Sequence, residues 1–105
     1  MKKQSAASHT MELYESPKKE QNNRNYGEFG AECICCGKPM KKGKCQFVQM
    51  NEGWVAVHPS VDENKFNQIT GANSQGCFPI GNECAKKMKG FTFESELNVT
   101  HPKYK

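Results

Sequence analysis

The chain has no long hydrophobic run. Within its 105 residues, no window approaches the roughly 20 consecutive apolar residues that a membrane-spanning helix requires. The first ten residues carry positive charge but lead into no apolar stretch, so they predict no secretory signal. We therefore expect a cytoplasmic protein without a membrane partner, in a compartment where thiols stay reduced.

Hydrophobic residues are scarce overall. They make up 35% of the chain, whereas globular chains have about 45–50% when glycine is also counted. A chain of this length has room for one small domain with a thin core, and such domains often need a staple. Six cysteines could provide one. Clustered cysteines in a reducing compartment more often bind metal, although disulfides stay an alternative because a mature secreted protein also lacks a signal.

Arginine and histidine are also in short supply. No arginine lies between Ala31 and Lys105, and there are three histidines. Because arginine is the preferred reader of base edges, sequence-specific DNA recognition is disfavoured. His58 has no acidic or histidine neighbour beside it, and no histidine follows Cys84 on the expected helix. A general base with a positioned partner is therefore missing, and we expect no enzymatic activity.

Four of the cysteines form two pairs about forty residues apart. The first pair is Cys33 and Cys36, a C-x-x-C motif followed at once by Gly37. The second is Cys77 and Cys84, where the chain enters a short expected helix. Thiolates are soft ligands that Zn²⁺ prefers, and a tetrahedral structural site needs four of them. We therefore expect one structural Zn²⁺ bound by Cys33, Cys36, Cys77 and Cys84.

The segments between the cysteines indicate a small α+β domain. Residues 45–50 and 54–58 are rich in β-branched and aromatic residues and predict a hairpin, with Gly53 as the left-handed last residue of its loop. Residues 59–76 are polar and predict a long loop with one possible turn around Phe66 and Ile69. Residues 82–89 predict a helix capped by Asn82, and residues 91–93 a short strand.

The ends of the chain are polar. Residues 1–30 show no sustained hydrophobic period and predict a disordered N-terminal arm. Residues 31–97 then form the zinc-binding domain, and residues 98–105 a polar C-terminal tail.

The order of knuckle, β-hairpin and cysteine at a helix start resembles the treble-clef class of zinc finger over residues 33–89. The resemblance implies that the knuckle and the helix N-terminus hold one metal ion between them. Treble clefs usually space the second pair as C-x-x-C or C-x-x-x-C, whereas Cys77 precedes Cys84 by seven positions. Ile80 or Gly81 stands where a ligand is expected, so His58 or Cys35 could replace Cys77. Otherwise Cys35 is a packed thiol, and Cys45, which alternates with Phe47, a small core residue.

The stretch from Gln75 to Lys87 also resembles part of the small zinc-finger proteins of bacteriophages and gut bacteria. That resemblance implies a phage or mobile-element origin and supplies no activity.

The sequence leaves two alternative functions. Lysines follow the knuckle and lie on the helix, and they predict non-specific or single-strand nucleic-acid binding with Trp54, Phe47 or Phe78 as stacking rings. The lysines concerned are Lys38, Lys41, Lys42, Lys44, Lys86, Lys87 and Lys89. The alternative is a protein-interaction adaptor that engages a host or phage protein through residues 1–30, with a purely structural zinc.

Overall fold

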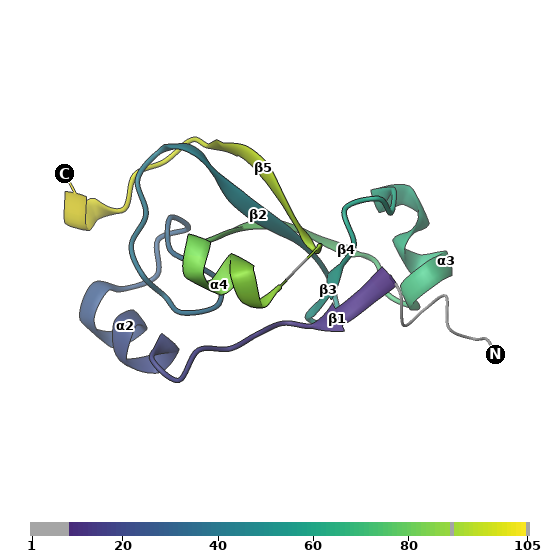
Figure 1. Ribbon diagram of the computed structural model, residues 1–105, viewed down its shortest axis with the longest axis horizontal. Coiled ribbons are helices and arrows are strands. Elements are labelled where there is room, and N and C mark those ends of the chain that lie inside the picture. Colours follow the sequence, from purple (N-terminus) through teal and green to yellow (C-terminus); the bar gives the residue numbers. More distant parts are fainter. Residues whose placement is uncertain (1–8, 89, 105) are drawn as a thin grey trace.

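A computed structural model describes residues 9–88 and 90–104, and its central element is the long strand β2 (Gly43–Asn51) (Figure 1). Residues 46–48 of β2 pair with both β4 (Ser74–Ile80) and β5 (Thr92–Leu97). Its residues 49–50 pair with both β4 and β3 (Val55–Val57). All these pairings are antiparallel, so β5 and β3 follow each other along one edge of β2 while β4 occupies the other.

The remaining elements are short. β1 (Thr10–Glu12) extends the sheet beyond β3, and α2 (Lys19–Tyr26) follows it. Between β3 and β4 lie the 3-10 turn η1 (Glu63–Lys65) and helix α3 (Phe66–Thr70). Helix α4 (Asn82–Lys87) separates β4 from β5, and the 3-10 turn η2 (Pro102–Tyr104) ends the described chain. No helix in the described part combines the length and apolarity that crossing a membrane would take.

The core consists of two clusters. The larger one, which we call the sulfur cluster, joins the cysteine knuckle, the sheet and α4; its buried members are Cys33, Cys35, Val48, Met50, Ala56, Ile80, Cys84 and Met88. The smaller one, the α3 cluster, contains Val57, Val61 and Phe66, with Ile69 packed against it. In Figure 1, α4 lies between the sheet and the segment that follows β1, whereas α3 lies beyond the far end of the sheet.

The predicted hairpin is present as β2 and β3, but its left-handed residue differs from the expectation. Trp54 has φ 61°, whereas Gly53 is not among the residues with positive φ. The buried side chain of Asn51 explains the turn, because its Oδ1 accepts the N–H groups of Gly53 (2.8 Å) and Val55 (3.2 Å). These bonds offset the modest cost of the left-handed conformation at a non-glycine residue.

The expected loop over residues 59–76 contains more regular structure than predicted. The turn expected around Phe66 and Ile69 is present as α3, preceded by η1, which Asp62 begins by accepting the N–H of Asn64. Phe66 is fully buried. Residues 74–76 are not loop but the start of β4, which continues to Ile80. Proline lacks a ladder donor, and Pro79 is tolerated because β4 is an edge strand.

The expected disordered arm over residues 1–30 also differs from the structure, which describes residues 9–30 as ordered elements. β1 pairs with β3 in the sheet, and Met11, Leu13 and Tyr14 pack against the sulfur cluster. The Ser16 N–H donates to the Cys35 carbonyl at 2.9 Å. Long-range strand pairing and burial therefore offset the ordering entropy, which local composition does not reveal. Residues 1–8 lie outside the described part.

The C-terminal tail is likewise anchored, through His101. This side chain is buried, its Nε2 lies 3.3 Å from the Gly27 carbonyl, and its ring packs edge-on against Phe29. Its backbone N–H donates to the Met40 carbonyl at 2.9 Å. The tail therefore joins the domain at the segment next to the knuckle.

Candidate metal centre

The cysteine knuckle is a tight turn that the chain closes with its own backbone. The Cys33 N–H donates to the Lys38 carbonyl at 2.9 Å, and the Gly37 N–H to the Cys33 carbonyl at 2.8 Å. Gly37 has φ 76°, and a Cβ there would come within 2.5 Å of Asn23 Oδ1. The glycine of the C-x-x-C-G motif is therefore required both by the turn and by the close approach of α2.

Helix α4 brings the distant cysteine to the knuckle. The helix begins after Gly81, and Cys84 lies buried in its first turn. The sequence placed the cap at Asn82, whereas the structure has Gly81 as the N-cap, a difference of one residue. Six residues cannot form a stable helix alone. The burial of Cys84 and Met88 against the sheet holds α4 in place.

Three buried thiols meet at this point, and a fourth lies beside them. Among the described residues, the sulfur atoms of Cys33, Cys35 and Cys84 all lie within 4.8 Å of one another, and all three residues are buried. The half-buried Cys36 interacts through its side chain with Cys33 and Cys84. Sulfurs around one tetrahedral Zn²⁺ are roughly 3.8 Å apart, given a Zn–S distance of about 2.3 Å.

The electrostatics of the cluster favour one thiolate and oppose four. Hydrogen bonding from the Cys35 thiol, aided by the backbone N–H groups of Gly81, Cys36 and Cys35, lowers the pKa of Cys33 to about 5 against the opposing effect of burial. The same Cys33–Cys35 bond and burial raise the pKa of Cys35. Burial first, and then the charge of Cys33, raises the pKa of Cys84.

Burial also raises the pKa of Cys36. Without a cation, further ionisation would place like charges next to Cys33 in a poorly solvated site. A divalent cation reverses this repulsion and deprotonates the thiols that bind it. The arrangement of four sulfurs therefore has the donor set and the charge imbalance that fit a thiolate-bound metal ion.

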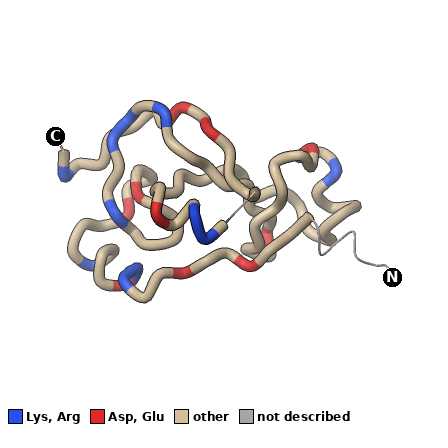
Figure 2. Tube along the Cα trace, in the orientation of Figure 1, with Lys and Arg blue, Asp and Glu red and all other residues tan. Residues whose placement is uncertain are grey.

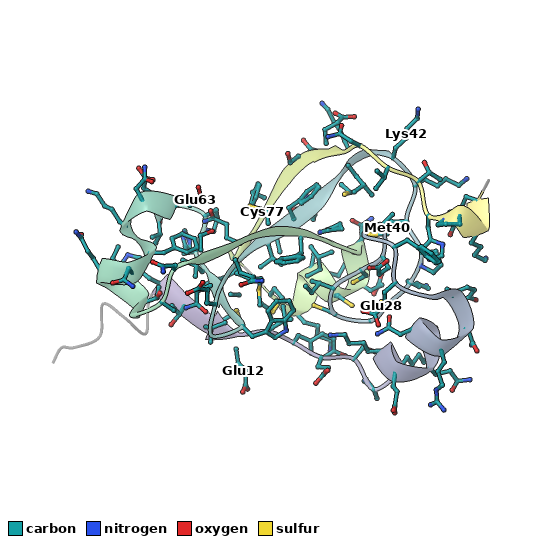
Figure 3. All side chains as sticks on the ribbon, turned by 180° about the vertical axis from the view of Figure 1, so that it is seen from behind. Glu12, Glu28, Met40, Lys42, Glu63 and Cys77 are labelled. Carbon is teal, nitrogen blue, oxygen red and sulfur yellow. The ribbon has the colours of Figure 1, made fainter. Side chains whose placement is uncertain are left out.

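Of the four predicted ligands, Cys33 and Cys84 lie in the group of mutually close sulfurs. Cys36 lies beside this group, and Cys77 lies away from it. Cys77 is exposed on β4 opposite Gln49, and its pKa is raised by partial burial and by the charge of Glu63. In Figure 3, Cys77 lies between Glu63 and Met40, nearer to Glu63. Because β4 is extended up to Ile80, the chain from residue 77 to residue 81 spans about 13 Å.

Cys35 occupies the place that the prediction assigned to Cys77. It was one of the two alternatives that the sequence left open. The other, His58, lies elsewhere: its Nδ1 is 2.8 Å from Ser60 Oγ, and its ring packs edge-on against Phe91. The sequence feature that indicated Cys35 as a candidate ligand was its position between Cys33 and Cys36, inside the knuckle.

Gly81 marks the position where a C-x-x-C pair on the helix would begin. A Cβ at Gly81 would lie 3.7 Å from Cys33 Sγ, without a positive φ to strain it. A cysteine at this position would therefore reach the cluster. In this chain Gly81 leaves the space free, and Cys35 supplies the sulfur from within the knuckle.

A pocket of about 680 Å³ opens onto the cluster. Cys33, Cys36 and Cys84 line it, and Lys38 and Lys87 stand among the polar residues around them. Cys35 is fully buried and is not among the lining residues. The pocket therefore exposes one side of the cluster to solvent next to two cations.

The predicted lysine set divides into separate groups. Lys38 and Lys87 line the pocket, and Lys87 also lies 5.7 Å from the ring centre of Tyr14. Lys86 pairs with Glu83 at 3.5 Å. Lys44 pairs opposite the acidic Glu96 on β5.

Lys41 and Lys42 lie instead toward the C-terminal turn. Lys41 Nζ is 4.9 Å from the ring centre of Tyr104, and the Lys42 N–H donates to Thr100. Lys89 lies outside the described residues. Figure 2 shows blue positions along the segment that leads into β2, at the C-terminal end and on α4, so the lysines do not form one continuous edge.

The predicted stacking rings are mostly engaged within the fold. Phe47 is half-buried and stacks on Phe93 at 6.2 Å. Phe78 is half-buried against Trp54 at 5.4 Å. Trp54 itself stays 44% exposed.

Comparison of the chain with protein-family models, with curated proteins and with solved structures finds no match. The geometry of the cluster therefore carries the functional argument by itself.

Proposed function

We propose that the protein is a zinc-stabilised binding module without enzymatic activity, in which one Zn²⁺ is held by Cys33, Cys35, Cys36 and Cys84. The observation that carries this proposal is the convergence of four thiols from the knuckle and α4 in an otherwise small core. Zinc suits four thiolates and the tetrahedral arrangement better than the hard cations, which prefer oxygen ligands. Four protein ligands leave no open position for a catalytic water.

The proposed architecture is treble-clef-like. The knuckle, the β2–β3 hairpin and α4 follow one another in the expected order, and α4 presents a cysteine to the knuckle. The departure is that Gly81 stands where the helix pair would begin and Cys35 replaces that ligand.

An exchange variant tests this assignment. Cys35→Ser should lower zinc affinity strongly, because the remaining hydroxyl is a poor zinc ligand. Adding Gly81→Cys to Cys35→Ser should restore one zinc per chain, because the new sulfur would start next to Cys33. Elemental analysis and native mass spectrometry measure the zinc content of both variants. If Cys35→Ser alone still bound one zinc per chain and Cys77→Ser bound none, the fourth ligand would be Cys77 and not Cys35.

The module is proposed to bind single-stranded nucleic acid non-specifically. Lys38 and Lys87 flank the pocket above the cluster, and further lysines surround the C-terminal turn. Four thiolates and one Zn²⁺ carry a net charge of −2, so part of the lysine charge balances the site and the rest is available to phosphates. The shortage of arginine agrees with binding that does not read sequence.

Fluorescence anisotropy with a labelled oligothymidylate at low salt tests this binding. The zinc-loaded protein should bind, and its affinity should fall steeply as salt rises. Lys38→Gln with Lys87→Gln should weaken binding and reduce the salt slope by roughly 0.7 for each phosphate that is no longer neutralised. Lys65→Gln, an exposed lysine beside α3, is the matched control and should leave binding unchanged. Absence of any salt-sensitive binding by the unmodified protein would contradict the proposal.

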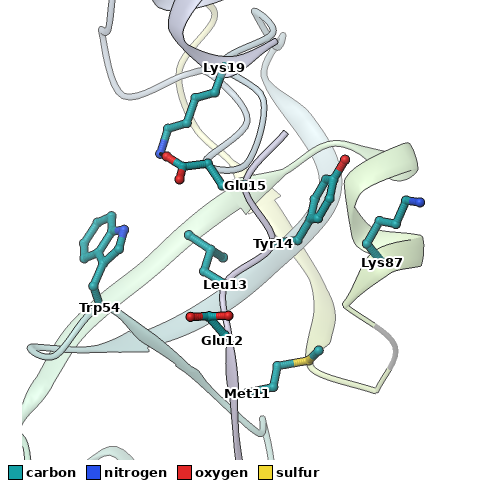
Figure 4. A pocket seen from close by; sticks show the side chains of 8 residues that line it. All are labelled: Met11, Glu12, Leu13, Tyr14, Glu15, Lys19, Trp54 and Lys87. Atoms are coloured by element: carbon teal, nitrogen blue, oxygen red, sulfur yellow. Dashed lines mark ion pairs between the residues drawn. The ribbon is translucent and has the colours of Figure 1, made fainter. Parts of the chain in front are cut away.

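A second candidate function is protein interaction, and one groove favours it. Met11, Leu13, Tyr14 and Trp54 line a pocket of about 700 Å³ between β1 and the hairpin turn (Figure 4). Two carboxylates and two lysines lie in the same lining, so the groove suits an apolar segment with charged flanks from a host or phage protein.

A pull-down with the purified protein distinguishes the two functions. Capture of one defined partner, lost in Leu13→Asp and kept in Lys38→Gln with Lys87→Gln, would favour the adaptor. Oligonucleotide binding that is lost in Lys38→Gln with Lys87→Gln and kept in Leu13→Asp would favour the nucleic-acid module.

A further inference from the structure

The C-terminal turn η2 forms a fixed platform on the side of the knuckle that faces away from α3. His101 anchors it through the Met40 carbonyl (2.9 Å) and the Gly27 carbonyl (3.3 Å). Tyr104 adds a contact by donating its hydroxyl to the Pro39 carbonyl at 3.5 Å. Side chains on η2 are therefore held in place relative to α2 and the segment leading into β2.

Two large rings stand exposed on this platform. Phe29 is 60% exposed and Tyr104 is 43% exposed. Phe29 is nevertheless positioned, because its ring packs edge-on against the buried His101 at 5.2 Å. A ring that is already fixed and still open to solvent loses little conformational entropy when another flat group stacks on it.

Lysines surround the same rings. Lys41 Nζ lies 4.9 Å from the ring centre of Tyr104, and Lys103 Nζ lies 5.3 Å from Tyr104 and 5.2 Å from Tyr26. Exposed cation–π contacts contribute only about 0.5–1 kcal/mol each. The ammonium groups can therefore turn to phosphates while the rings stack on bases. We name Tyr26, Phe29, Lys41, Lys103 and Tyr104 together the aromatic–lysine surface.

Two carboxylates lie near Phe29 in the chain, and one of them is already engaged. The carboxylate of Glu32 accepts the N–H groups of Phe29 (2.7 Å) and Gly30 (3.0 Å). Glu28 is the other. Trp54, a ring of similar exposure to Tyr104, lies outside this surface at the hairpin turn, in a pocket with two carboxylates and two lysines.

We propose that the aromatic–lysine surface binds single-stranded nucleic acid, with bases stacked on Phe29 and Tyr104 and phosphates near Lys41 and Lys103. This inference rests on the proposed nucleic-acid function and adds stacking contacts to the phosphate contacts proposed for Lys38 and Lys87. Single strands fit because their bases expose flat faces, which a duplex hides in its stack. Stacking is tolerant of sequence, in agreement with the shortage of arginine.

Anisotropy titrations with the zinc-loaded full chain and a labelled oligothymidylate test the surface. Phe29→Ala with Tyr104→Ala should weaken binding about tenfold or more. Phe29→Trp with Tyr104→Trp should restore it, because the larger rings stack as well. Lys41→Gln with Lys103→Gln should also weaken binding and reduce its salt slope. Trp54→Ala is the matched control, since it removes an exposed ring at the hairpin turn, outside the aromatic–lysine surface, and it should bind as the unmodified protein does.

The outcomes separate this inference from the proposed function. If the unmodified protein binds and the double alanine variant binds equally well, the aromatic–lysine surface is excluded while the nucleic-acid function stands. If Trp54→Ala weakens binding as much as the double variant, the surface is also excluded. If the unmodified protein binds no oligonucleotide at low salt, the proposed function fails and this inference fails with it. If polyglutamate bound as tightly as the oligothymidylate, and the ring variants did not change that affinity, charge attraction alone would explain binding. That result would overturn the stacking model.

Discussion

The sulfur cluster and the α3 cluster are packed on the same sheet but are held together by different means. The α3 cluster brings together Val57, Val61 and Phe66, which are close in sequence and wholly apolar. The sulfur cluster brings together the knuckle and α4, which are far apart in sequence; three buried thiols lie within it, and Cys36 packs against it. One region is therefore stabilised by local hydrophobic burial, and the other combines hydrophobic burial with thiols that could hold a metal ion.

The comparison shows why a chain with so few hydrophobic residues can close its fold. Bringing α4 to the knuckle costs the closure entropy of a long loop, which grows with loop length. Side-chain burial by a six-residue helix contributes little against that cost. A metal ion bound by both segments would contribute the missing free energy, so the two clusters should respond very differently to metal removal.

The largest expected effect is that of metal removal. A strong chelator should unfold the knuckle and α4, because the apparent binding free energy of a structural zinc, about 10–16 kcal/mol at neutral pH, is coupled to folding. Circular dichroism and thermal melting with and without chelator measure this. A melting temperature that does not change after verified zinc loss would show that the sulfur cluster is stable without metal.

The next largest effect should come from Cys84→Ser, compared with Cys77→Ser. Losing Cys84 breaks the link between α4 and the knuckle, so the variant should lose zinc and most of its stability. Losing the exposed Cys77 should change the free energy of unfolding by no more than about 0.5 kcal/mol. Zinc content and urea denaturation of both variants provide the measurement. Equal losses in the two variants would mean that Cys77 takes part in the metal centre.

Phe66→Ala tests the α3 cluster in the same way. Phe66 is fully buried, and removing a buried phenyl ring typically costs about 3–5 kcal/mol. Zinc content should stay at one per chain in the fraction that remains folded, because no thiol is affected. If Phe66→Ala also lowered the affinity for zinc in folded protein, the two clusters would be coupled more closely than their separation suggests.

The smallest effect should come from Cys45→Ser. Cys45 is half-buried on β2, and its thiol lies outside the sulfur cluster. Serine should therefore cost about 1 kcal/mol or less, with zinc retained, whereas Cys36→Ser should lose zinc. Urea denaturation of the pair, with thiol counting, checks the difference. A metal-dependent loss at Cys45 would require a ligand set other than the one proposed.

The sequence predicted the parts of this fold whose signals are local. The hairpin follows from two β-branched runs around Asn51 and Gly53, and α4 follows from the helix-favouring residues after Gly81. The knuckle follows from C-x-x-C-G, and two of the predicted ligands, Cys33 and Cys84, do meet. These elements depend on neighbours in the chain, so a pattern over a few residues is enough to find them.

The parts that sequence analysis missed depend on distant partners. β4 has Gly76 and Pro79 and is a weak strand by composition, yet it pairs along β2. β1 forms because β3 offers it an open edge. His101 is a polar residue near the end of the chain, and it is buried because Gly27 and Met40 provide carbonyl groups for its anchoring bonds.

The amino-acid sequence by itself determined that this chain would concentrate thiols in a knuckle and at a helix start, because motif spacing and helix signals act over a few residues. Only the tertiary structure decided which thiols meet. The extended course of β4 carries Cys77 away from the knuckle, whereas the turn of the knuckle brings Cys35 inward. That choice belongs to strand pairing across the sheet, whose energy depends on residues far apart in the chain.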